Sequence, residues 1–494
     1  MLGLRDTSTP LPMHPTKRQK TCSLLSDEAL YPRRAECRLP PELMQHVARF
    51  LETCDAFFGF MEAFVDKDAL GLLQHVWKLS TVVPRHDLWP QLVLDQQPHH
   101  RSIPLLGKVT PFYPIVHIRG AVDWTVVRQL SATPIAWTMP SPTLWHPSHV
   151  APLLKIVSLS IQAGVTCDVI DTLFPLLPHL RTLKVQTKNE TTTSALTCFL
   201  LRSNVTSLHV RGQDWFDEDE SDFQLTQLTS RHIRDVTQWL LNTRVRSLTW
   251  SNFDWQSSES AMQGLYAAIF LSPSLLTFSH DWMPLPWMDT LAMKQPISIQ
   301  SLKLTACELN AACIKSLSVG LVGSTVIALD ISHNRTLGVQ GLRHLTTVLP
   351  QTNIRTLGLC CVGMDDRACE RLAAALPRTR IQHLNISGNF ITHVGAGALA
   401  WHLPEAAQLK TLFVQLEDTC VVGSTALIES LGRRRAAPVE LFIFSYNMTA
   451  DEVLQLNALA ARFPSLKKCC VKHSTLERSW NLVLGLLENF SVAH

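Results

Sequence analysis

The chain has 494 residues, of which 46% are hydrophobic and 17% are charged, and its formal net charge is +3. This near-neutral charge gives no reason to expect a nucleic-acid partner, and since no run of about 18 apolar residues occurs, we expect no membrane span. The length exceeds that of one compact domain, a limit that a repeat array escapes because each unit packs only on its neighbours.

The start of the chain reads as a polar tail. Residues 1–38 are rich in Pro, Ser, Thr and basic residues, which predicts a flexible segment. The basic cluster 17–20 is either a nuclear import signal or simply solvated. No signal peptide is recognisable, and thirteen cysteines occur without a paired CxxC pattern. We therefore expect reduced thiols and a cytoplasmic and/or nuclear location.

Residues 39–92 predict a small helical module. In "LPPELMQHVARFLETCDAFFGFMEAF" (39–64), Pro40 and Pro41 suit a helix start, and Leu43, Val47, Phe50 and Leu51 then lie on one helical face. The stretch resembles the F-box, which opens with LPxEL, and "RHDLWPQL" (85–92) resembles the Trp-containing segment that often follows it. The Cys-x-x-Trp spacing of the family's second half is absent. The resemblance implies that Leu39, Pro40, Leu43 and Val47 bind a Skp-type adaptor; the alternative is a helical cap on the first repeat.

Residues 93–150 form a Pro/Trp-rich linker, in which "YPIVHIRG" and "TPIAWTMP" could be degenerate first strands. Over 151–298, irregular repeats are marked by apolar anchor residues at Leu159, Leu183, Leu208, Leu248 and Phe278. The longest gap between anchors contains the acidic insert "DWFDEDESDF" (214–223). We interpret this insert as a solvated loop, or as a docking loop for a basic partner.

Residues 299–473 carry a regular period. The anchors are Leu302, Leu329, Leu357, Leu384, Leu412, Phe442 and Cys469, at successive gaps of 27, 28, 27, 28, 30 and 27 residues. Each anchor has apolar residues three positions before and two positions after it, and most are followed by leucines at helical spacing. This pattern resembles the leucine-rich repeat of the ribonuclease-inhibitor-like subtype. The motif's Asn/Cys position reads Cys307, Asn334, Val362, Asn389, Glu417 and Asn447, where a buried amide can satisfy backbone groups of the neighbouring turn.

The resemblance implies an α/β leucine-rich-repeat solenoid, a horseshoe with parallel strands on the concave face and helices on the convex face, joined to the F-box-like module. Residues 474–494 are predicted to form a C-terminal capping helix. The residue between the two inward-facing positions of each strand should line the concave face. We expect this row to bind a protein through Lys184, His209, Lys303, Asp330, Asn385, Phe413 and Ile443.

No nucleotide-binding or HExxH motif occurs, so we expect no enzymatic activity, no cofactor and no metal site. An F-box joined to leucine-rich repeats implies a substrate receptor of an SCF-type cullin–RING ubiquitin ligase, which binds the Skp-type adaptor and an unknown protein substrate. The alternative is a leucine-rich-repeat scaffold or inhibitor-like binder without a ligase role. A GTPase-activating protein of the Ran-regulating kind shares this repeat subtype, but the acidic tail is missing and no catalytic arginine stands out.

Overall fold

The computed structural model describes residues 40–64, 70–95, 103–121, 130, 133–141, 155–213, 225–417, 421–445 and 447–473. Leu39, the basic cluster, the acidic insert and the expected capping helix 474–494 lie outside these residues. The chain divides into two compact units, Met1–Gln74 and His75–His494, so the boundary falls inside the module expected over 39–92.

The first unit contains two short helices, α1 (Pro41–Ala48) and α2 (Cys54–Glu62). Pro40 precedes α1 and Glu42 lies in its first turn, while the Thr53 hydroxyl caps α2 by accepting the amide of Ala56 at 3.2 Å. Met44 and Ala48 of α1 are buried, as are Phe57, Phe58 and Met61 of α2. The core of this unit is therefore aromatic and sulfur-rich.

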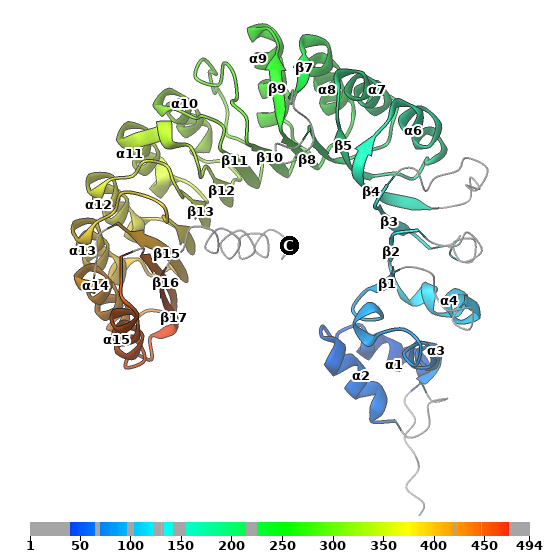
Figure 1. Cartoon of the computed structure of the whole chain (residues 1–494), viewed down its shortest axis with the longest axis horizontal. Helices are drawn as coiled ribbons and strands as arrows, with labels where there is room; N and C mark the ends of the chain where they lie inside the picture. The colour runs from blue at the N-terminus through cyan, green and yellow to red at the C-terminus, as the bar shows by residue number, and fades with distance from the viewer. Residues whose placement is uncertain are drawn as a thin grey trace, which may run out of the picture. The chain divides into compact units, whose positions relative to one another are not determined.

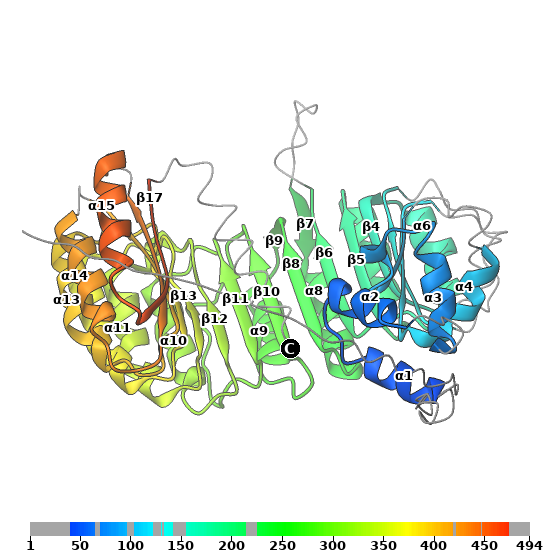
Figure 2. The same ribbon diagram turned by 90° about the horizontal axis from the view of Figure 1, so that it is seen from below.

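The second unit is built on one 15-stranded sheet in which neighbouring strands pair in parallel. Figure 2 shows the strands side by side in a continuous row. In spatial order the strands are β1 (Leu92–Asp95), β2 (Val116–Arg119), β3 (Ile135–Met139), β4 (Ile156–Val165), β5 (Thr182–Thr187), β6 (Ser207–Arg211), β8 (Ser247–Ser251), β10 (Thr277–Asp281), β11 (Ser301–Thr305), β12 (Ala328–Asp330), β13 (Thr356–Gly358), β14 (His383–Asn385), β15 (Thr411–Leu416), β16 (Val439–Ser445) and β17 (Leu466–His473). A separate two-stranded ribbon pairs β7 (Thr226–Thr229) with β9 (Phe253–Gln256).

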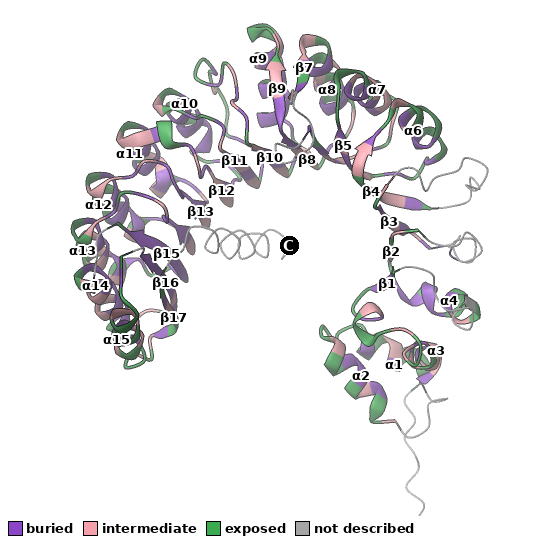
Figure 3. Ribbon diagram, in the orientation of Figure 1, coloured by how far each residue is buried: buried purple, intermediate pink, exposed green. Residues whose placement is uncertain are grey.

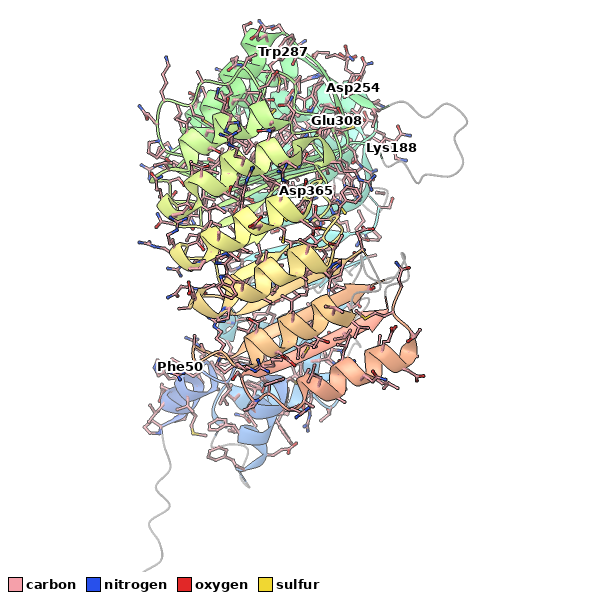
Figure 4. All side chains as sticks on the ribbon, turned by 90° about the vertical axis from the view of Figure 1, so that its left-hand side faces the viewer. Phe50, Lys188, Asp254, Trp287, Glu308 and Asp365 are labelled. Carbon is pink, nitrogen blue, oxygen red and sulfur yellow. The ribbon has the colours of Figure 1, made fainter. Side chains whose placement is uncertain are left out.

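Helices follow the strands and lie on one face of this sheet, the outer side of its curve, as Figure 1 shows for the second unit. They are α6 (Cys167–Thr172), α7 (Glu190–Leu200), α8 (Ser230–Asn242), α9 (Glu259–Phe270), α10 (Ala311–Leu321), α11 (Gly338–Val348), α12 (Asp366–Ala375), α13 (His393–His402), α14 (Val421–Gly432) and α15 (Ala450–Ala460). Nearer the start, α3 spans Leu73–Leu79 and α4 spans Ile103–Val109. Figure 4 shows the later helices stacked in one layer. The α/β architecture and long parallel sheet are consistent with a solenoid of the leucine-rich-repeat type.

The predicted anchors form the core between sheet and helices. Leu302, Leu329, Leu357, Leu384 and Leu412 pair in one register, and each is at most 2% exposed. The upstream anchors from Leu159 to Phe278 continue the same row without a break. The two degenerate strands expected near the start are present as β2 and β3. In Figure 3 the buried residues, drawn in purple, recur from strand to strand along the sheet.

The last two repeats correct one anchor. Leu412 pairs with Leu441, not with the predicted Phe442, and Leu441 in turn pairs with Cys469. The segment "VELFIFS" is apolar at almost every position. It therefore lacks the polar/apolar alternation that would show which side chains face the core. A register shift at Val439/Glu440 accompanies this change of phase.

The buried asparagines bind the backbone as expected. The Asn389 side-chain oxygen accepts the amides of Val362 at 3.0 Å and Met364 at 3.1 Å, and its NH2 group donates to the carbonyls of Leu359, Ile386 and Ser387 at 2.8, 2.9 and 3.3 Å. Asn334 makes the same set of bonds two repeats earlier. These amides tie each turn to the preceding one, which fixes the stacking of the repeats.

Candidate protein-binding surfaces

Most of the predicted binding residues lie in one row across the sheet. The register joins Lys184 to His209, Thr249, Ser279, Lys303, Asp330, Gly358, Asn385, Phe413, Phe442 and Cys470. Ile443 does not belong to this row: it pairs with Val414 and Val471 and is fully buried in the core. Its prediction is wrong because the phase error at Phe442 moves the whole strand by one residue, which exchanges the two faces.

The amino-terminal part of the row is basic. Lys184 and Arg211 are exposed, and Lys303 is half-buried. Between them, the pKa of His209 is lowered to about 4 by burial and by the positive charges of Lys184, Arg211 and Lys303, so the imidazole is neutral at pH 7. Burial raises the pKa of Asp281 at the end of β10, although the positive charges of Lys303 and Arg211 lower it. This basic region favours a ligand that brings negative charge.

The middle of the row offers less than the sequence suggested. The Asp330 carboxylate accepts the amide of Ser332 at 3.1 Å, and the Asn385 side-chain oxygen accepts that of Ser387 at 3.0 Å. Asn385 is only 3% exposed. Both oxygens therefore stabilise the turns that follow their own strands, and Asn385 does not contribute a surface group.

The carboxyl-terminal part of the row is an aromatic cluster of Phe413, Phe442 and Phe444, against which Cys470 packs. The rings of Phe413 and Phe442 stack with centroids 4.5 Å apart and an interplanar angle of 9°. The ammonium of Lys468 lies 5.3 Å from the Phe442 centroid, at a distance typical of a cation–π contact. The row therefore changes from polar to apolar as expected, with Phe442 in place of Ile443. The three rings are each only 4% exposed, so this apolar end leaves little open surface.

A second column of side chains was not anticipated. Each repeat strand has two side chains that face the core, at alternate positions. In six successive units of the main sheet, the residue two positions after the second of these has a left-handed backbone, with φ between 54° and 68°. These residues are Asn252, Trp282, Ala306, His333, Cys361 and Gly388. Gly388, Asn252 and His333 are residue types enriched in this conformation, whereas Trp282, Ala306 and Cys361 are not. We call these six residues the left-handed column; its most exposed large side chain is Trp282, at 62%.

In the first unit, α1 exposes an apolar stripe. Leu43 is 43% exposed, Val47 37% and Phe50 72%, whereas Met44 and Ala48 on the adjacent face are buried. The spacing of four and then three residues places the exposed side chains along one side of α1 and its C-terminal turn. Figure 4 labels Phe50, and Pro40, just before the helix, is also exposed. Three of the four predicted adaptor-binding residues are thus described, and all three are accessible.

Chemical sites are sparse in the described part of the chain. Among these residues, no group of three or more His, Cys, Asp or Glu side chains is arranged to hold a metal ion. None of the helices in the described residues is both long enough and apolar enough to cross a bilayer. The candidate functional surfaces among the described residues are therefore the strand row and the apolar stripe of α1.

Comparisons with known proteins agree with the repeat architecture at a distance. No family model matches the chain. A stretch of 143 residues is 28% identical to the mouse (Mus musculus) NACHT, LRR and PYD domains-containing protein 14, covering 28% of this chain and 14% of that protein. Among solved structures, Leiomodin-1 Actin-Binding Site 2 aligns with 33% of this chain and 87% of its own, at 14% identity and a TM-score of 0.23. Together, the mouse relative and the long parallel sheet are compatible with a protein of the leucine-rich-repeat type.

Proposed function

We propose that the chain is an F-box substrate receptor, which recruits a protein to an SCF-type cullin–RING ubiquitin ligase and catalyses nothing itself. The observation that carries the proposal is the exposed stripe of Leu43, Val47 and Phe50 on α1. An apolar helix face left open to solvent marks a partner site, because burying it on a partner is favourable. The LPPEL sequence at the start of this helix supports a Skp-type adaptor as that partner.

In this proposal the strand row holds the substrate. The basic region at Lys184, Arg211 and Lys303 would meet acidic side chains, and the aromatic cluster on β15 and β16 marks the apolar end of the same row. A long row of strand side chains is the usual binding surface of stacked repeats. The leucine-rich-repeat relative supports a protein-interaction role for this part of the chain.

The test is capture of a purified Skp-type adaptor by the full chain at micromolar concentration. Val47→Glu should abolish capture, since it places a charge in the apolar stripe, and should leave the thermal unfolding temperature unchanged because Val47 is exposed. The double change Leu39→Ala with Pro40→Ala should also abolish capture. A matched control is Val422→Glu on α14, an exposed valine that should not affect capture.

The strand row by itself favours a second candidate, a repeat scaffold or inhibitor-like binder without a ligase role. A wild-type chain that binds no Skp-type adaptor would refute the receptor proposal and leave this one. The scaffold proposal also predicts that changing Leu39 and Pro40 lowers thermal stability, because the helices would then serve only as a cap.

A further inference from the structure

Two adjacent cysteines follow β13 at the edge of the sheet. The sulfurs of Cys360 and Cys361 lie 3.7 Å apart, and Cys361 belongs to the left-handed column, with φ of 54°. The left-handed backbone turns the second side chain back toward the first, which an extended strand does not do. The chain contains its own comparison: Cys469 and Cys470 are also adjacent, but they lie within β17, where successive side chains point to opposite faces.

We propose that Cys360 and Cys361 form a redox site, in which a small hydroperoxide such as hydrogen peroxide converts the two thiols into a disulfide between neighbouring residues. This site does not depend on the adaptor or the substrate of the proposed function.

The surroundings divide the pair into an attacking and a resolving sulfur. A hydrogen bond from the Cys360 thiol, a hydrogen bond with His333 and the positive charge of Arg335 together lower the pKa of Cys361 to about 5, against the effect of burial. The same bond to Cys361, together with burial, raises the pKa of Cys360. Of the two sulfurs, Cys361 is therefore the one whose thiolate is favoured, so we assign it as the attacking sulfur and Cys360 as the resolving one. His333 is the preceding member of the left-handed column, which explains why it reaches Cys361.

The two sulfurs are nearly buried, so only a small oxidant can reach them. Cys360 and Cys361 are each 7% exposed. Gly388, the next member of the column, leaves the space that the Cys361 sulfur occupies, since a β-carbon there would overlap this sulfur. A peroxide can reach such a site, whereas a bulky disulfide reagent cannot pass the neighbouring turns.

The chemistry is balanced with peroxide as the oxidant. The Cys361 thiolate attacks one peroxide oxygen; the S–O bond forms, the O–O bond breaks, and the departing hydroxide takes a proton to become water. The Cys360 sulfur then attacks the sulfenic sulfur; the S–S bond forms, the S–O bond breaks, and the leaving hydroxide combines with the Cys360 proton as a second water. Two thiols are oxidised to one disulfide and one peroxide is reduced to two waters.

Oxidation would act on the repeats at either side. The Cys361 amide donates to the carbonyl of Ser387 at 3.0 Å, and the Cys360 carbonyl accepts the amide of His333 at 2.7 Å. The Cys360 amide also donates to the Ser332 hydroxyl at 3.0 Å. A ring closed through the peptide bond between the cysteines must rotate these groups, so the bonds to the turns that follow β12 and β14 would weaken together.

The experiment treats the full chain with a small excess of hydrogen peroxide, alkylates it after denaturation, and maps tryptic peptides by mass spectrometry. We expect the peptide 356–367, which contains both cysteines, to lose two hydrogens, to resist alkylation and to recover with dithiothreitol. The peptide with Cys469 and Cys470 should stay doubly alkylated under the same conditions.

Two variants separate the roles. Cys360→Ser should stop at a sulfenic acid on Cys361 that dimedone labels, and Cys361→Ser should abolish peroxide consumption at the site. His333→Asn should slow oxidation severalfold while the circular dichroism spectrum is unchanged. Oxidation of both cysteine pairs at equal rates, or a peptide 356–367 that remains doubly alkylated, would overturn the proposal.

Discussion

Replacing Asn389 with alanine tests whether the buried asparagines hold the repeats together. Asn389 is fully buried, and its loss leaves the amides of Val362 and Met364 without their acceptor. An unsatisfied buried donor costs about 1–3 kcal/mol, so two donors give roughly 2–6 kcal/mol before any loss at the three carbonyls is counted.

Hydrogen exchange is the appropriate assay, because a repeat array can open in parts and a single global free energy need not report one site. At about 1.4 kcal/mol per factor of ten, the lower figure predicts exchange roughly thirtyfold faster at Val362 and Met364. The control is Asn447→Ala, where an exposed asparagine side chain donates to one carbonyl, that of Glu417, at 2.9 Å. That change should cost only about 0.5–1.5 kcal/mol. Equal effects of the two substitutions would refute the reasoning.

Three further outcomes are expected. Leu384→Ala should cost roughly 2–5 kcal/mol in urea unfolding through the cavity it leaves; a cost below about 1 kcal/mol would contradict the core assignment. Arg434→Ala should cost at least about 1.5 kcal/mol and Arg434→Lys should not restore it, because the buried guanidinium donates to the carbonyls of both Ala406 and Leu409, at 2.6 and 2.9 Å. Stability should fall as the pH drops from about 6.5 toward 4, since the pKa of His209 is about 4 in the fold and 6.5 in the unfolded chain, which then binds the extra proton. His209→Gln should reduce this loss of stability without abolishing it, because burial also lowers the pKa of His280 to about 4. An unchanged profile would count against the assigned environment of His209.

The repeat period and most of the register could be predicted because anchors such as Leu302 and Leu384 stand between polar residues, which define their phase. The prediction failed where that contrast disappears, at Leu441 and Phe442 in a strand that is apolar on both faces. There, the phase depends on the backbone irregularity near Val439, which has no sequence signature of its own.

The candidate surface was predicted less well, for two physical reasons. Side chains such as those of Asp330 and Asn385 lie in the predicted row, but they bind their own turns, and sequence spacing does not distinguish a solvent-facing oxygen from one used locally. The left-handed column was missed because half of its members, Trp282, Ala306 and Cys361, are not residue types that favour this conformation. Only the coordinates bring His333 and Cys361 together.

The parallel pairing of strands that are neighbours in the sequence also affects how the chain can fold while it is being synthesised. Every strand from β10 to β16 pairs with the strand that follows it in the sequence, and their anchors are only about 24–29 residues apart. Most long-range contacts of a given repeat are therefore complete once the next repeat has been synthesised, whatever the length of chain still to come. Folding can then advance one repeat at a time behind translation, and the apolar edge exposed at any moment is a single strand wide.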